Sequence, residues 1–384
     1  MQKKERVLVA MSGGVDSSVA AALLKDQGYE VIGVTMQIWP TYAEASAGKP
    51  SSQGCCSLSA VEDARRVADK LGIPHYVLNY QDLFYDKVIC NFIAEYKNGR
   101  TPNPCVRCNE HIKFDALIKK ADEMDAQYLA TGHYARIKYE NLNTKSETNP
   151  KSQISNNKQF MLLKGKDPGK DQSYFLYMLN QVNLSRILFP MGGYLKEDTR
   201  KLAEKYGLAV ADKVDSQEIC FVNEDNYGSF IEKHVPGSCR SGEIVDQNGK
   251  VYGGHRGITN YTVGQRRGLG VSYKKPLYVI KIDVEKNQVV VGEEEDTYGE
   301  ELLAKDISWV GAQDLVTRFQ LPGSRCQKIN AKIRYATPEY QAKLLPLEKG
   351  KVRVVFDEPV KAITPGQAVV FYDGDEVLGG GTIE

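Results

Sequence analysis

Short apolar runs alternate with helix-like segments through the first half of the chain. The runs have the length and residue types of strands, and the segments between them have the apolar spacing of helices. Strands that alternate with helices are typical of a parallel sheet covered on both faces. The pattern therefore predicts a doubly wound α/β domain. Its predicted strands are 6–11, 30–36, 75–78 and 128–131, and its predicted helices are 59–71, 82–96 and 114–124.

The pattern changes twice further along the chain. From about residue 205 to 276 it is irregular and rich in glycine, which predicts a small central α+β domain. From residue 277 onward, short alternating runs separated by Gly, Pro and Asp turns predict a C-terminal β-barrel. The predicted domains are therefore 1–204, 205–276 and 277–384, and the polar stretch 140–158 is predicted to be a flexible insertion within a hairpin.

Composition narrows the functional classes only slightly. The chain has 384 residues and a net charge of +1, so a surface for nucleic acid must be a local patch. It has neither a hydrophobic signal region nor an apolar run of about 18 residues, which predicts a cytoplasmic protein with no membrane contact. Its eight cysteines are expected to be reduced, catalytic or metal-binding and not a disulfide framework.

A loop rich in Gly and Ser follows the first predicted strand. Its sequence, SGGVDSS at 12–18, combines two glycines, several hydroxyls and the start of a helix. Glycines let backbone N–H groups approach an anion, and a helix N-terminus favours negative charge, so the loop predicts a phosphate site. It lacks the lysine of a Walker A loop. Because ligands of such sheets bind beyond the strand ends, Met36 and the turn at Gly132 are expected beside it. The alternative is an ordinary turn.

Two thiols three residues apart form a second candidate centre. Cys105 and Cys108 follow two prolines, which are expected to exclude helix there, and precede a predicted helix. A helix N-terminus and the neighbouring Arg107 would lower a thiol pKa. Half of a zinc site is the alternative, although no second pair has comparable spacing. Cys220 is far away in sequence and is either near this pair in space or a buried, inert cysteine.

The order of strand, loop and helix resembles the PP-loop ATP pyrophosphatases, and further blocks narrow the resemblance to the tRNA 2-thiouridylases. The matching blocks are AMSGGVDSS at 10–18, GRTPNP at 99–104, ATGHY at 130–134, GKDQSY at 169–174, SQEICF at 216–221, GGHRG at 253–257 and GQRRG at 264–268. The resemblance implies a tRNA-uridine 2-sulfurtransferase that adenylates the C2 oxygen of the wobble uridine and replaces it with sulfur. A PP-loop amide ligase and an RNA-binding module without turnover are the alternatives, but neither uses both the loop and the thiols.

The resemblance also implies roles for single residues. Cys108 would be the nucleophile, and Cys220 would carry a persulfide, with a possible disulfide between the two. A cysteine desulfurase or a sulfur-relay protein would supply the sulfur. Asp16 would hold Mg²⁺ or cap the following helix. The implied ATP-binding residues are Ala10, Met11, Ser12, Gly13, Gly14, Val15, Asp16, Ser17, Met36 and Gly132.

The resemblance places the anticodon loop of tRNA against residues from several blocks. Splayed loop bases are read by stacking and by hydrogen bonds to base edges. The implied tRNA contacts are Asn103, Pro104, Cys105, His133, Lys170, Asp171, Gln172, Arg334, Tyr335 and Gln367. Plainer roles are open for some of them: His133 as a buttress of the ATP turn, Lys170 as a solvated side chain and Tyr335 as barrel core.

One residue departs from the family pattern. Cys105 stands where many relatives have an aspartate proposed as a general base, and a thiol could act as a base only with a suitably low pKa. Cys105, Cys108 and Cys220 would alternatively suit three ligands of a [4Fe–4S] cluster whose fourth iron binds sulfide. The sequence leaves persulfide relay and cluster chemistry both open.

Overall fold

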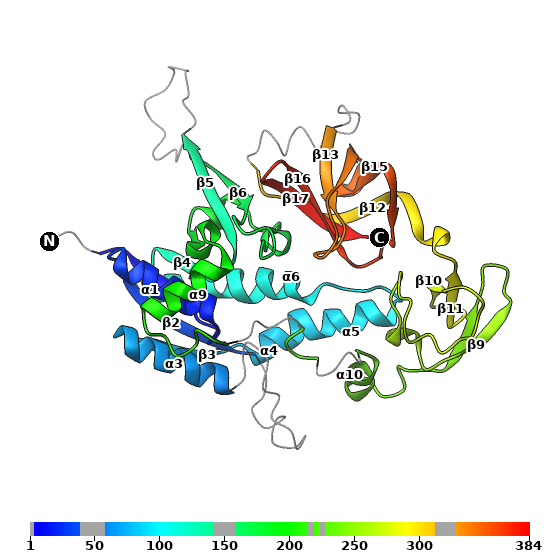
Figure 1. The fold of residues 1–384 in the computed structure, drawn as a ribbon, viewed down its shortest axis with the longest axis horizontal. Helices are drawn as coiled ribbons and strands as arrows, with labels where there is room; N and C mark the ends of the chain where they lie inside the picture. Colours follow the sequence, from blue (N-terminus) through cyan, green and yellow to red (C-terminus); the bar gives the residue numbers. More distant parts are fainter. Residues whose placement is uncertain (1–3, 39–57, 142–157, 214–218, 223–226, 312–326) are drawn as a thin grey trace.

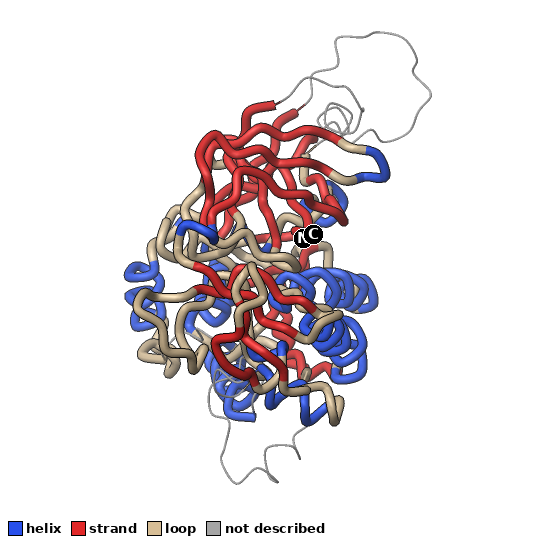
Figure 2. Tube along the Cα trace, turned by 90° about the vertical axis from the view of Figure 1, so that its right-hand side faces the viewer, coloured by secondary structure: helices blue, strands red, loops and turns tan. Residues whose placement is uncertain are grey.

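The computed structural model describes residues 4–38, 58–141, 158–213, 219–222, 227–311 and 327–384. Figure 1 shows the α/β domain at one end, the central sheet at the other, and the barrel above the helices between them. Figure 2 shows the same barrel strands above the helical layer from a second direction. The architecture has the three predicted parts: a doubly wound parallel sheet, a small central unit and a β-barrel.

A five-stranded parallel sheet forms the centre of the α/β domain. Its order is β3–β2–β1–β4–β7, so the chain moves to opposite sides of β1 and the strand order reverses between β1 and β4, the place where ligands of such sheets bind. The four predicted strands are confirmed to within one residue, whereas the very short β7 has no counterpart in the prediction. The strands are β1 (Arg6–Ala10), β2 (Glu30–Gln37), β3 (His75–Asn79), β4 (Tyr128–Thr131) and β7 (Ile187–Leu188).

Successive apolar side chains of β1 point to opposite faces of the sheet, which explains why helices cover both faces. Val7 and Val9 pack into one apolar cluster, and Leu8 and Ala10 pack into another. The first cluster includes α1 (Val15–Asp26), α3 (Leu58–Leu71) and α9 (Lys196–Lys205). The second includes α4 (Gln81–Phe84), the π-helix η1 (Tyr85–Ile89), α5 (Cys90–Lys97), α6 (Pro104–Cys108), the π-helix η2 (Asn109–Ala116) and α7 (Leu117–Glu123).

The prediction that prolines exclude helix around the thiol pair is wrong. Cys105 and Cys108 both lie inside α6, which runs directly into η2 and α7. Asn103 accepts a hydrogen bond from the backbone N–H of Val106, and Pro104 occupies the first helical position. Proline is tolerated there because that N–H has no partner within the helix anyway. The helix therefore begins ten residues earlier than the predicted start at residue 114.

The central unit contains α10 (Tyr227–His234) and a four-stranded sheet. The sheet order is β10–β11–β8–β9, and its strands are β8 (Gly242–Val245), β9 (Val251–His255), β10 (Tyr278–Asp283) and β11 (Gln288–Gly292). The prediction placed the start of the barrel at residue 277, but β11 pairs with β8 and β10 pairs with β11. Residues 278–292 therefore belong to the central sheet and not to the barrel. Their side chains Val279, Val289 and Val291 also pack in the apolar core of the central unit.

The barrel is closed by pairing between its first and last strands. The strands run β12–β15–β14–β13–β16–β17, and β12 also pairs with β17, which removes both free edges. A hairpin of the α/β domain, β5 (Ala135–Asn141) and β6 (Lys158–Lys164), joins β17. Most of the predicted insertion 140–158 lies outside the described residues. The barrel strands are β12 (Tyr298–Trp309), β13 (Gln327–Lys332), β14 (Tyr340–Pro346), β15 (Val352–Lys361), β16 (Ala368–Asp373) and β17 (Glu376–Ile383).

The α/β domain and the barrel share one apolar core. Tyr174 and Tyr177 of the first pack in the same cluster as Val370 and Tyr372 of the second. The Tyr174 side chain is fully buried, and its hydroxyl donates to the Ala368 carbonyl at 2.8 Å. A core of this kind fixes the two domains relative to one another.

We expect Tyr174→Phe to lower the free energy of unfolding by about 1–3 kcal/mol, because the buried Ala368 carbonyl loses its donor. Urea unfolding followed by fluorescence and by circular dichroism would measure the change. A loss well under about 0.5 kcal/mol would contradict a role for this bond in holding the two domains together.

Candidate active site

The predicted phosphate loop lies at the carboxyl end of β1. Gly13 has a φ of +67°, and a Cβ atom there would lie 2.1 Å from the Ala60 carbonyl oxygen, so only glycine fits. Gly14 is the N-cap residue of α1 and has no side chain with which to cap the helix. The first N–H groups of a helix are donors suited to an anion at the end of the loop. This geometry supports a phosphate site and disfavours an ordinary turn.

The turn after β4 lies against the start of α1. A Cβ atom on Gly132 would lie 2.7 Å from the backbone nitrogen of Ser17, so the two backbones approach as closely as glycine allows. Met36 is buried near the end of the neighbouring strand β2. The structure thus brings the predicted ATP-binding residues together at the carboxyl edge of the sheet.

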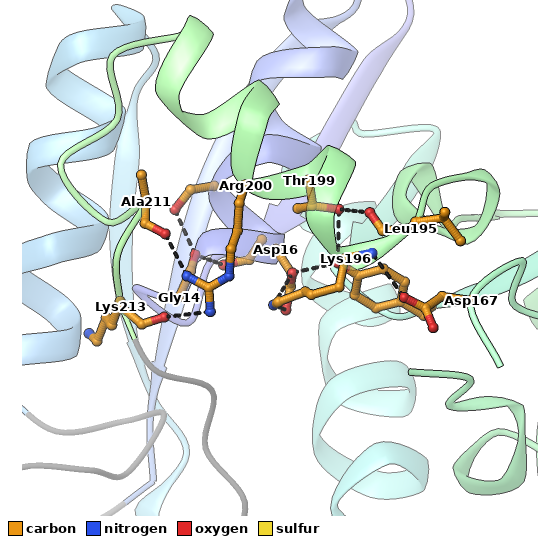
Figure 3. A network of polar contacts seen from close by, with 12 residues as sticks. Gly14, Asp16, Asp167, Leu195, Lys196, Thr199, Arg200, Ala211 and Lys213 are labelled. Atoms are coloured by element: carbon orange, nitrogen blue, oxygen red, sulfur yellow. Dashed lines mark hydrogen bonds and ion pairs between the residues drawn. The ribbon is translucent and has the colours of Figure 1, made fainter. Parts of the chain in front are cut away.

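Asp16 is engaged within the protein. Its carboxylate accepts hydrogen bonds from Lys196 Nζ at 2.7 and 2.9 Å and from the Tyr134 hydroxyl at 2.8 Å. Figure 3 shows Asp16 and Lys196 pointing toward one another. Asp16 therefore does not cap α1. Mg²⁺ is commonly bound by one or two carboxylates together with substrate phosphates, so Asp16 fits a bound Mg²⁺ only if it exchanges its lysine partner.

Two lysines that the sequence analysis missed flank the loop. Lys196, the first residue of α9, is 11% exposed in its side chain, and Lys213 donates to the Gly13 carbonyl at 3.0 Å and pairs with Asp63 at 2.7 Å. Each lysine is paired with a carboxylate, Lys196 with Asp16 and Lys213 with Asp63. The two ion pairs therefore place cationic groups beside the loop without a net positive charge. No local motif marks them, because they are 180 and 200 residues from their partners in the loop.

The thiol pair projects from α6. Cys105 is exposed, and Cys108 is half-buried against the apolar core that contains Phe114. We expected Arg107 to favour the thiolate form of a neighbouring cysteine. Its guanidinium nitrogen Nη1 lies 3.5 Å from the carboxylate oxygen Oε2 of Glu110, which offsets its charge. Of the pair, Cys105 is the more exposed residue.

Cys220 is exposed, so the alternative of a buried, inert cysteine is wrong. The next residue, Phe221, packs edge-on against Phe84 and Phe92, with ring centres 5.6 and 5.2 Å apart. The ring contacts of Phe221 anchor residues 219–222 to α4 and α5. The π-helix η1, which lies between α4 and α5 in the chain, also contacts α6. Among the described residues, which include Cys105, Cys108 and Cys220, no three Cys, His, Asp or Glu side chains are grouped to hold a metal ion.

Several of the expected tRNA contacts use their polar atoms inside the protein. The Asp171 carboxylate accepts from Ser173 and from the Gly165 backbone N–H, and the Gln172 side chain accepts from the Tyr134 backbone N–H at 3.0 Å. Arg334 and Gln367 likewise donate to backbone carbonyls.

Tyr335 and Lys170 lie nearer the surface. Tyr335 is 38% exposed, and its ring centre lies 4.6 Å from that of Phe175 in the α/β domain. It is therefore not part of the barrel core. Lys170 is half-buried, in the same block as Asp171 and Gln172. Lys332 Nζ lies 5.6 Å from the centre of the Tyr335 ring, and an exposed aromatic ring with a lysine over it has the chemistry of a base-stacking and phosphate-binding surface.

His133 is buried beside the Gly132 turn. Its Nδ1 lies 2.7 Å from Thr131 Oγ1, and its ring packs against Phe114 and Phe189. Burial is the main cause that holds the pKa of His133 well below its usual value, so the ring is neutral. These contacts favour a buttress for the ATP turn over a direct contact with RNA.

Three family models match the chain. A "tRNA methyl transferase HUP domain" matches residues 5–224, a "tRNA methyl transferase PRC-barrel domain" matches 228–293, and an "Aminomethyltransferase beta-barrel domain" matches 299–383. A tRNA-specific 2-thiouridylase MnmA of Acetivibrio thermocellus is 51% identical over 381 residues, which cover 99% of each chain. A protein of the same name from Halothermothrix orenii is 49% identical over 380 residues, with the same coverage.

The chain belongs to the tRNA 2-thiouridylase family. The resemblance drawn from its sequence blocks is thereby confirmed, as is the fold class. The solved structure of a 4-thiouridine synthetase in complex with RNA and ATP is 16% identical to this chain. The match covers 56% of this chain and 45% of the synthetase chain, and its TM-score of 0.34 is too low to support a conclusion. In the described ranges, no helix has the length and apolar character needed to cross a bilayer.

We expect Gly132→Ala to raise the KM for ATP about tenfold or more, because the added methyl group would displace the start of α1 and with it the phosphate cradle. Gly193→Ala is the matched control, since a Cβ atom there meets nothing within 4 Å. Steady-state formation of AMP with varied ATP would measure both variants. Equal KM values would contradict the placement of ATP at this turn.

We expect stability to fall as the pH drops below about 6.5, the pKa of histidine in an unfolded chain. The unfolded chain then takes up a proton that the buried His133 does not, which favours unfolding. His133→Gln should therefore reduce the slope of the unfolding free energy between pH 6 and 5 by up to about 1.4 kcal/mol per pH unit. Urea unfolding at several pH values would test this.

Some slope should remain in the variant, because burial also lowers the pKa of His75 and of His255. Identical slopes in the variant and the parent protein would show that His133 is not held neutral.

Proposed function

We propose that the chain catalyses ATP-dependent 2-thiolation of the wobble uridine in the anticodon loop of tRNA. The observation that carries this proposal is the combination of a phosphate cradle and a helix-borne thiol pair in one α/β domain, in a chain about half identical to named 2-thiouridylases. An amide ligase would have no use for the thiols.

The cradle supports the first chemical step. The C2 carbonyl of uracil is a poor electrophile whose oxygen leaves poorly, so transfer of AMP to that oxygen, with release of pyrophosphate, supplies a good leaving group. The backbone at Gly13 and Gly132 and the start of α1 would bind the phosphates. Lys196 and Lys213 would offset the phosphate charge by exchanging Asp16 and Asp63 for phosphate oxygens. Mg²⁺ would enter with ATP.

The exposed cysteine on the anchored segment supports the second step. Cys220 would receive a persulfide from a donor such as a cysteine desulfurase or a sulfur-relay protein. The terminal sulfur attacks C2, and AMP leaves. Cys108 then attacks the Cys220 sulfur, so that a Cys108–Cys220 disulfide forms and the thiocarbonyl sulfur stays on the base; an external thiol reopens the disulfide.

Each of the three domains would have its own part in the reaction. The α/β domain, predicted as 1–204, would hold ATP and the pair Cys105 and Cys108, with Asn103 and Pro104 beside the flipped base. Lys170 and Tyr335 would contact the anticodon loop. The central unit, predicted as 205–276 and extended by β10 and β11, and the barrel would supply the remaining RNA surface.

The deciding experiment uses anaerobic protein and the variants Cys105→Ala, Cys108→Ala and Cys220→Ala, with the exposed Cys90→Ala as a matched control. We expect the Cys108 and Cys220 variants to lose 2-thiouridine formation by about 10³-fold or more, and the Cys105 and Cys90 variants to keep turnover. The Cys220 variant should still form AMP with tRNA, because activation precedes sulfur transfer.

Iron and acid-labile sulfide measured on the same samples separate the two sulfur routes. Stoichiometric iron that is lost in all three variants and tracks activity would replace the persulfide route with cluster chemistry. A parent protein that forms no AMP in the presence of tRNA would overturn the proposed function itself.

A further inference from the structure

Residues 99–103, here called the strap, connect α5 to α6 and cross the junction of all three domains. On the side of the central unit, a Cβ atom on Gly99, whose φ is +67°, would lie 2.9 Å from Val284 Cγ2. The Thr101 hydroxyl lies 3.2 Å from that of Thr262. The strap is thus packed against the central unit just before it reaches the thiol-bearing helix.

The barrel holds the strap from the other side. The Thr101 backbone N–H donates to the Pro365 carbonyl at 2.8 Å. Gln367 Nε2 donates to the carbonyls of Thr101 at 2.9 Å and of Pro102 at 3.2 Å. A Cβ atom on Gly366, which has a φ of +91°, would lie 2.9 Å from the Thr101 nitrogen. The barrel turn 364–367 is therefore packed directly against the strap, and the two cannot move independently of one another.

Arg334 fixes the barrel turn in place. Its guanidinium donates to the Ala362 carbonyl and the Thr364 hydroxyl within the barrel, and to the Val263 carbonyl of the central unit. Arg334 reaches the strap only through this turn. A chain of polar contacts thus runs from Val263 through Arg334, the turn and the strap to the start of α6.

We infer that Gln367 is a positioning residue for the nucleophile, holding the strap so that α6 presents Cys108 to the base. The inference rests on the proposed function and goes beyond it. Both donor hydrogens of the Gln367 amide are directed to strap carbonyls, and Asn103, the last strap residue, caps α6. A shift of the strap would move the thiols, and misplacement by about 1 Å is enough to cost up to 10²-fold in rate.

Gln367→Met tests the inference, because methionine keeps the length of the side chain and removes its donors. Gln341→Met is the matched control, on an exposed site of β14 in the same barrel. Three quantities are measured: the Kd for tRNA, the single-turnover rate of 2-thiouridine formation at saturating tRNA, and the rate of iodoacetamide alkylation at Cys108 without tRNA, with Cys90 as internal reference.

We expect Gln367→Met to reduce the single-turnover rate about tenfold, to leave the Kd for tRNA within about twofold, and to change Cys108 alkylation about threefold or more. The Gln341 variant should match the parent protein. A raised Kd with an unchanged rate at saturation and unchanged alkylation would overturn the inference and make Gln367 a tRNA contact.

A second variant reaches the same contact from another direction. Gly366→Ala adds a methyl group against Thr101 and should change Cys108 alkylation in the same sense, whereas unchanged alkylation in both variants overturns the inference even if either loses stability. The alkylation readout needs neither ATP nor tRNA. A failure of the proposed function, seen as a parent protein without thiolation, is therefore distinguishable from a failure of this inference.

Discussion

Tyr174, Tyr177 and Tyr372 lie in an apolar core that the α/β domain shares with the barrel. The rest of the arrangement depends on this shared core, because it fixes the distance between the strand ends that form the phosphate cradle and the barrel turn that holds the strap. Close-packed interiors transmit displacement instead of absorbing it. The parallel sheet, α6 and the barrel can therefore hold fixed positions relative to one another around the proposed reaction site.

Asp16 and Lys196 form an ion pair with little exposure of the lysine, next to the start of α1. A largely desolvated ion pair contributes little to stability by itself, so such a pair is more readily explained by orientation than by stability. Here it orients a cation and a carboxylate at the first turn of α1, beside the phosphate loop.

The sequence predicted the strands of the α/β domain well and made no prediction of the contacts between domains. Strands 6–11, 30–36 and 128–131 follow from local apolar runs, which is why they agree with β1, β2 and β4. The phosphate loop and the thiol pair were found because their residue types and spacing are local signals. The helical state of the thiol pair was not, because Pro104 was read as a helix breaker although it occupies the one turn where proline is accepted.

By itself, the sequence determined which residues can do chemistry: the glycines that permit close backbone approach, the hydroxyls and the cysteines. Only the tertiary structure decided which distant groups serve them. Lys196 and Lys213 reach the loop across 180 and 200 residues, and Gln367 reaches the strap across more than 260. The physical reason is that residue type and spacing encode local conformation, whereas partners this far apart are brought together only when the apolar cores of all three domains have packed.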